Sequence, residues 1–349
     1  MSLRLSTEPL GAPWSRPMRG RFDTLVVDSE VLAGNPLGDP ARRPLYVYSS
    51  PGVATGAVTD VASVYVLQGY TGQLDKWLAR VSFEPTFPER LDDMFTAGGC
   101  PDAVVVLVDA WTSLGGSQFL NSSATGRYMD YLCDEVVPFV GDRYPVSGAR
   151  GVTGHSSGGY GAAVSAMLRP DVFHGFASHA GDSLFEVSLQ RDFAPAARAL
   201  RDRFAGSYAK LLEAVPAADP FDWGTFGTAL SVYAYAAAYS PDPDRPGEVL
   251  LPFEIATGRL IPEVWERWLA RDPVRMAAHH AAALRGLKRI YLDAGRGDEY
   301  FLDLGTQAFA RELARLGVEH TFELFDGRHG GISYRYPTAI RELIVALSR

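Results

Sequence analysis

The segment that most constrains the fold is Gly154-His-Ser-Ser-Gly158, a Gly-x-Ser-x-Gly pattern centred on Ser156. A short strand-like piece at 150–153 precedes it, and a helix of small residues follows it. A strand, a sharp turn and a helix in this order expose the serine hydroxyl at a helix N-terminus, where unpaired N–H groups favour developing negative charge. We therefore predict that Ser156 is a catalytic nucleophile. A glycine-rich structural turn is the alternative interpretation.

Strand-like and helix-like segments alternate along most of the chain. Strand patterns lie at 22–32, 44–50, 61–67, 103–109, 150–153, 174–180, 287–293 and 318–325. Helical spacing of apolar residues recurs at 88–97, 128–139, 161–169, 272–284, 305–316 and 337–347. This alternation calls for a doubly wound, mostly parallel sheet of about eight strands. Together with the serine turn, it predicts the α/β-hydrolase fold.

The pattern changes between residues 186 and 271. This stretch is rich in alanine and aromatic residues, contains a proline-rich breaker at 241–246, and has no obvious strand. We predict that residues 1–185 and 272–349 form the catalytic domain and that 186–271 form a helical insertion that packs over the sheet as a lid. Two or three extra helices within the main layers are the alternative.

The composition limits which kinds of partner and which cellular compartment we expect. The net charge of the 349 residues is −8 and no basic run occurs, so we expect neither nucleic acid nor membrane as a partner. The first ten residues lack an apolar signal core, and no long apolar run exists, which favours a cytoplasmic protein. The sequence leaves the oligomeric state open, with a homodimer as one option.

The two cysteines and the chain's other ligand-type residues give no sign of a cofactor. Cys100 and Cys133 lie far apart in sequence, which makes a poor disulfide framework, and no metal-ligand spacing occurs. We expect both to be free thiols and the protein to use no metal or other cofactor. A cysteine nucleophile is a weaker alternative, because neither cysteine lies in a strand–turn–helix segment.

A serine hydroxyl needs a base to take its proton and a carboxylate to orient that base. In this fold the chain order is serine, acid, histidine. His329 lies in a glycine-flanked loop just after the last predicted strand, and we predict that it is the base. His155 adjoins the nucleophile, so we expect its side chain to point elsewhere.

Four carboxylates lie at the end of the predicted strand at 287–293 or after it, and one of them is expected to orient the base. They are Asp293, Asp298, Glu299 and Asp303. We favour Asp298, because its loop can reach the His329 loop, and Asp293 remains the alternative. For the oxyanion hole we predict the backbone N–H groups of Ser157 and of Tyr70, which follows the third strand.

Several stretches carry a family resemblance. They are Val64-Tyr-Val-Leu-Gln-Gly-Tyr70, Ser117-Gln-Phe-Leu-Asn-Ser122, Glu135-Val-Val-Pro138, the Ser156 turn, Leu292-Asp-Ala-Gly-Arg-Gly-Asp298 and Phe325-Asp-Gly-Arg-His329. They resemble the putative-esterase family of α/β-hydrolases, which includes S-formylglutathione hydrolases, feruloyl and acetyl-xylan esterases, enterobactin-type esterases and mycolyltransferases. The resemblance implies a triad of Ser156, Asp298 and His329.

Two departures from that family limit what the resemblance implies. Gln68-Gly69 stands where many relatives have His-Gly or Asp-Gly, and the 186–271 region is longer than in compact members. The resemblance therefore does not identify the substrate.

The function that these features favour is a serine carboxylic-ester hydrolase acting on a small-molecule ester through an acyl-enzyme. An acyltransferase that passes the acyl group to an alcohol or sugar would use the same residues. A peptidase and a non-catalytic binding module on a hydrolase scaffold are the further alternatives.

Overall fold

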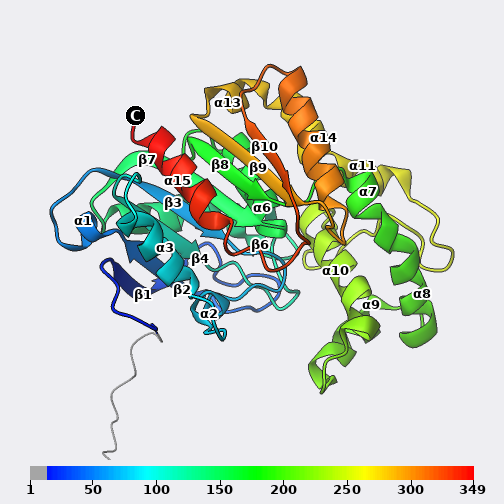
Figure 1. Cartoon of the computed structure of the whole chain (residues 1–349). Coiled ribbons are helices and arrows are strands. Elements are labelled where there is room, and N and C mark those ends of the chain that lie inside the picture. Colours follow the sequence, from blue (N-terminus) through cyan, green and yellow to red (C-terminus); the bar gives the residue numbers. More distant parts are fainter. Residues whose placement is uncertain (1–13) are drawn as a thin grey trace, which may run out of the picture.

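Eight strands form one twisted sheet in the computed structural model, which describes residues 14–349 (Figure 1). In spatial order they are β1 (Arg21–Asp28), β2 (Arg42–Ser49), β4 (Ala103–Val108), β3 (Val61–Leu67), β7 (Val146–His155), β8 (Gly175–His179), β9 (Arg289–Gly295) and β10 (Thr321–Phe325). The β1–β2 and β2–β4 pairs are antiparallel, and the other five pairs are parallel. The predicted doubly wound, mostly parallel sheet is therefore confirmed.

The central strands are apolar on both faces because helices cover both. Every residue of β3 and of β4 is buried. Alternate side chains of β3 point into different cores: Tyr65 and Leu67 join the larger cluster, and Val64 and Val66 join the other. This is the period-two pattern of a strand between two helical layers.

Two helices, α3 (Phe87–Thr96) and α15 (Tyr336–Leu347), pack over the smaller core, and α15 lies across the sheet in Figure 1. The opposite layer contains α6, α12, α13 and α14, which span Ser157–Leu168, Pro273–His279, Ala281–Gly286 and Leu302–Arg315. Both layers leave the carboxyl ends of β7, β8 and β9 free to support loops.

Between β8 and β9 the described chain is helical and adds no strand to the sheet. Besides α12 and α13, its α-helices are α7 (Phe185–Ser188), α8 (Phe193–Arg203), α9 (Tyr208–Ala214), α10 (Trp223–Tyr239) and α11 (Pro262–Leu269). Figure 1 shows α8, α9 and α10 gathered beyond one end of the sheet. The side chain of Trp268 is fully buried here, and its Nε1 donates to Ser240 Oγ at 2.8 Å. The division into a catalytic domain and a lid stays a prediction.

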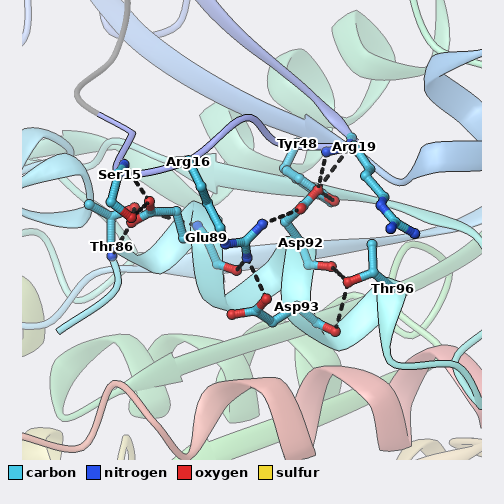
Figure 2. A network of polar contacts seen from close by, with 10 residues as sticks. Ser15, Arg16, Arg19, Tyr48, Thr86, Glu89, Asp92, Asp93 and Thr96 are labelled. Atoms are coloured by element: carbon cyan, nitrogen blue, oxygen red, sulfur yellow. Dashed lines mark hydrogen bonds and ion pairs between the residues drawn. The ribbon is translucent and has the colours of Figure 1, made fainter.

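The N-terminal segment is fixed to α3 through one buried carboxylate, Asp92 (Figure 2). Asp92 Oδ1 accepts the N–H groups of Arg19 at 3.0 Å and Gly20 at 2.8 Å. The same oxygen accepts the Tyr48 hydroxyl at 2.9 Å, and Oδ2 accepts Arg16 Nη1 at 3.1 Å. These bonds satisfy a charge that would be costly to bury alone.

Two local features differ from the sequence prediction. The polar loop after β4 contains a small hairpin of β5 (Asn121–Ser122) and β6 (Gly126–Arg127). The single helix expected at 128–139 is instead α4 (Tyr128–Asp130), a π-helical turn (Tyr131–Val136) and α5 (Val137–Gly141). Pro138 lacks an N–H for the α-helical bond, which accounts for the irregular turn before it.

Both cysteines are free thiols. Burial raises the pKa of Cys100 to about 11 and that of Cys133 to about 12, so both stay protonated near neutrality. Among residues 14–349, no helix combines the length and apolar character needed to cross a bilayer, and no group of three or more ligand-type side chains could hold a metal ion. The first ten residues, to which the signal-sequence prediction refers, lie outside the described residues.

Candidate active site

Ser156 lies at a strained turn between β7 and α6. Its φ and ψ are 58° and −127°, a conformation that residues other than glycine rarely adopt. A Cβ on Gly158 would lie 2.4 Å from the Leu67 carbonyl oxygen, and one on Gly154 would lie 2.4 Å from the Gly158 carbonyl oxygen. Strand and helix therefore cross so closely that both flanking positions require glycine.

His329 and Asp298 form a hydrogen-bonded pair on neighbouring loops. His329 follows β10, Asp298 follows β9, and His329 Nδ1 lies 2.7 Å from Asp298 Oδ2. The other carboxylate oxygen accepts the Tyr300 N–H at 2.8 Å, which fixes the acid, and Glu299 Oε2 accepts the His329 N–H at 2.9 Å. With Nδ1 engaged, Nε2 is the ring nitrogen left to exchange a proton.

Asp293, the alternative acid, has other partners. Its Oδ1 lies 2.6 Å from His179 Nδ1, and its Oδ2 accepts Arg335 Nε at 2.9 Å. Both Asp293 and His179 are fully buried at the ends of β9 and β8. The structure thus brings His329 together with Asp298 and pairs Asp293 with a second histidine.

The expectation that His155 points away from the site is wrong. The centroids of the His155 and His329 rings lie 4.3 Å apart, and both rings line the same cavity. Burial, reinforced by the charges that His329 and His179 would carry, lowers the pKa of His155 well below its ordinary value. His155 is therefore a neutral ring packed against His329. The left-handed turn at Ser156 breaks the strand alternation on which the expectation depended.

The loop after β3 passes directly over the serine. A Cβ on Gly69 would lie 3.0 Å from the His155 carbonyl oxygen and 3.4 Å from Ser156 Cβ. The next residue, Tyr70, has no backbone acceptor for its N–H among the described residues, whereas the Thr71 N–H donates to Gly115 O at 2.7 Å. Ser157 is the first residue of α6, so its N–H has no partner within the helix.

A cavity of about 290 Å³ connects these elements. Its lining includes Ser156, His329, Tyr70 and, from α10, Trp223 and Tyr235. The Tyr70 ring centroid lies 6.3 Å from that of Trp223 and 6.1 Å from that of Tyr235. Helix α10 thus contributes aromatic side chains to the wall of the cavity that Ser156 also lines.

Sequence reasoning missed one further group in this cavity, Asp182. Its Oδ2 accepts Gln118 Nε2 at 2.9 Å and Ser157 Oγ at 3.2 Å. Gln118 also donates to the Tyr239 hydroxyl at 2.6 Å. Burial raises the pKa of Asp182 above its ordinary value, although these hydrogen bonds oppose the shift. A signal was available, because Asp182 directly follows a predicted strand whose end faces the serine.

A protein-family model described as putative esterase matches residues 110–335. The chain belongs to the putative-esterase family. The family and esterase activity predicted from the sequence are thereby confirmed. A search of curated protein sequences found no significant match.

Solved structures with similar backbones include the following three proteins. A ferulic acid esterase is 17% identical, with a TM-score of 0.58 over 94% of this chain and 98% of its own. An S-formylglutathione hydrolase from Agrobacterium tumefaciens is 14% identical, with a TM-score of 0.55 over 96% of this chain and 98% of its own. MPT51 (FbpC1) of Mycobacterium tuberculosis is 16% identical, with a TM-score of 0.55 over 94% of this chain and 99% of its own. These similarities confirm the α/β-hydrolase fold.

Proposed function

We propose that this esterase hydrolyses small-molecule carboxylic esters through an acyl-enzyme formed on Ser156. The observation that carries the proposal is the 2.7 Å contact between His329 and Asp298, with His329 and Ser156 lining one cavity. A serine, a histidine and a carboxylate in this arrangement are the parts that nucleophilic acyl transfer requires.

In the proposed mechanism, Ser156 Oγ attacks the ester carbonyl while His329 Nε2 takes its proton. Asp298 holds the Nδ1–H tautomer and offsets the charge on the imidazolium. The N–H groups of Tyr70 and Ser157 stabilise the oxyanion. His329 then protonates the leaving alcohol, and a water molecule, activated by the same base, hydrolyses the acyl-enzyme.

We propose that the helical stretch 186–271 acts as a lid on this site. Support comes from α10, whose residues Trp223 and Tyr235 line the same cavity as Ser156. A volume of about 290 Å³ suits a small ester, and the aromatic wall favours flat or apolar groups. An acyltransferase would use the same acyl-enzyme, so adding alcohol acceptors during turnover and analysing the products separates the two activities.

The first test compares the hydrolysis of short and medium p-nitrophenyl esters by the wild type and by Ser156→Ala. We expect the variant to lose about 10⁴-fold or more in kcat/KM. Ser165→Ala is the matched control, because Ser165 is a buried serine of α6 whose hydroxyl has no partner among the described residues. A Ser156→Ala variant as active as this control would contradict the proposal. A fluorophosphonate probe that labels the wild type but not Ser156→Ala would identify the nucleophile directly.

A further inference from the structure

A carboxylate without a cationic partner lies in the proposed substrate cavity. Asp182 is only 2% exposed, yet it lines the cavity beside Ser156. Its Oδ2 holds the two hydrogen bonds from Gln118 and Ser157, and its Oδ1 has no hydrogen-bond partner among the described residues. No Arg, Lys or His of the part that the structure describes forms an ion pair with it.

Burying a carboxylate without a cationic partner destabilises the folded protein. Buried carboxylates are ordinarily paired with a cation or remain protonated, because removing the charge from water costs several kcal/mol. The family reaction, as proposed above, has no use for a carboxylate here. Asp182 accepts from the hydroxyl of Ser157, the residue whose N–H is proposed for the oxyanion hole. A negative charge there would oppose the oxyanion, unless a positive charge lay next to it.

The walls of the cavity suit a positive charge. Tyr70, Trp223 and Tyr235 line the same cavity as Asp182, and their rings lie together, with the Tyr70 centroid 6.3 Å from that of Trp223 and 6.1 Å from that of Tyr235. Tyr300 lines the cavity from the Asp298 loop. Aromatic rings attract ammonium groups through their negative faces, most strongly where water is excluded. An aromatic wall combined with a buried carboxylate is the chemistry that recognises an ammonium ion.

The other charged side chains of the lining do not neutralise Asp182. Arg191 lies 3.5 Å from Asp192 and donates to the Glu299 carbonyl oxygen at 2.9 Å. Its guanidinium also covers the Phe301 ring, 4.9 Å from the centroid. The Arg191 and Asp192 charges therefore offset each other. His329 also lines the cavity, and its charge would lower the pKa of Asp182, but His329 is paired with Asp298, whose charge raises that pKa. Asp182 therefore has no cationic partner of its own among the described residues.

We propose that the esterase prefers esters that carry an ammonium group in their acyl or alcohol part, and that Asp182 is the counter-ion that selects them. This inference rests on the proposed function, because it takes the Ser156 cavity as the substrate site. Asp182 is then a specificity-determining residue. It acts through charge, while its Oδ2 keeps Gln118 and Ser157 in place.

The test uses two pairs of isosteric esters. The acyl pair is the p-nitrophenyl ester of γ-butyrobetaine and the analogue in which tert-butyl replaces trimethylammonium. The alcohol pair is butyrylthiocholine and its tert-butyl analogue. We expect the wild type to prefer the cationic member of one pair by about tenfold or more in kcat/KM, and the pair that shows the preference identifies the part of the ester that carries the charge.

Asp182→Asn tests the charge at nearly constant shape, because an amide oxygen can still accept from Gln118 and Ser157. We expect the preference to fall to about onefold, mainly through a higher KM for the cationic ester. Asp202→Asn is the control, since Asp202 lies on α8, outside the cavity lining, and pairs with Arg201. It should keep the preference.

A wild type that favours the neutral member of both pairs would overturn the inference. A preference that survives Asp182→Asn would also overturn it. An equal loss of kcat/KM for the cationic and the neutral ester would overturn it too, because Asp182 would then only support the structure of the site. If the variant does not fold, the wild type is tested for inhibition of neutral-ester hydrolysis by tetramethylammonium chloride, with sodium chloride at equal ionic strength as the control. Stronger inhibition by tetramethylammonium supports the inference, and equal inhibition contradicts it. Neutral-ester hydrolysis that persists in Ser156→Ala would instead refute the proposed function.

Discussion

At the scale of single residues, the close crossing at the serine turn sets the strictest requirement on the sequence. Gly158→Ala would place a Cβ 2.4 Å from the Leu67 carbonyl oxygen, where backbone rather than a flexible side chain must move. We expect Gly158→Ala to lower both the free energy of unfolding, by about 3 kcal/mol or more, and the esterase activity.

Gly286→Ala is the matched control for that substitution. Gly286 ends α13, and a Cβ there would meet no heavy atom within 4 Å. Alanine should leave the urea midpoint unchanged or raise it, because it favours the helix. Equal midpoints for the two variants would show that the turn tolerates a side chain.

Two aspartates, Asp293 within β9 and Asp298 in the loop after it, should separate activity from stability. Asp298→Asn removes the group that orients His329, and we expect kcat to fall about 10³- to 10⁴-fold while the protein stays folded. Asp293→Asn removes a buried partner of His179 and Arg335, so we expect a loss of about 3 kcal/mol in stability with a much smaller effect on kcat. Ester hydrolysis and urea unfolding of both variants provide the measurement. A reversed pattern would assign Asp293 as the acid.

At this scale, the sequence could predict the site residues whose positions follow from the fold. The loops after β9 and β10 meet because parallel strands end at one edge of the sheet, so the neighbourhood of Asp298 and His329 could be anticipated. The position of His155 could not, because it depends on one left-handed residue. The place of Asp182 after a predicted strand was a signal in the sequence, but its lack of a cationic partner was not, because only coordinates reveal partners.

At the scale of elements, α3 depends on a capping box that also holds the N-terminal segment. Glu89 accepts the Thr86 N–H at 2.7 Å and the Ser15 N–H at 2.6 Å. Burial opposes the charge of Glu89, but these hydrogen bonds lower its pKa to about 2.

Glu89→Gln should therefore destabilise the protein at neutral pH by about 1 to 2 kcal/mol. A carboxylate with a lowered pKa stabilises the folded state above its ordinary value of 4.5, and this contribution is lost as the pH falls from there through about 2. The gap between the urea midpoints of wild type and variant should narrow over that range. Glu84→Gln, which removes an exposed ion pair with Arg90, should show little gap at any pH.

The elements themselves were predictable where their periodicity was strong. Strand β3 begins and ends where the apolar run does, and α15 begins one residue earlier than predicted. The β5–β6 hairpin was not predictable, because two-residue strands carry no periodicity. The π-helical turn at Tyr131–Val136 was not predictable either, because the apolar spacing up to Val136 also fits an α-helix. After this turn Val137 and Val140 are buried, whereas the predicted Phe139 is only partly buried.

At the scale of the whole molecule, Arg191 joins the helical stretch 186–271 to the loop that holds Asp298. It donates to the Glu299 carbonyl oxygen at 2.9 Å and lies over Phe301. Arg191→Ala should loosen this junction, lowering kcat by about tenfold and making residues 186–271 more sensitive to protease. Arg198→Ala removes an equal charge from the exposed surface of α8 and should do neither. Unchanged kinetics in Arg191→Ala would mean that lid and loop are independent.

The order of the strands in the sheet has a consequence during synthesis. The strand that ends at Ser156 lies in the middle of the sheet, but β9 and β10, which carry the acid and the base, come much later in the chain. At the usual pace of translation, roughly 10 to 35 seconds separate the addition of Ser156 from that of His329. Throughout that interval the nascent chain has a nucleophile without its proposed base. Ester hydrolysis in the cell should therefore begin only with chains that have been synthesised through the His329 loop, and nascent chains should be inert toward esters.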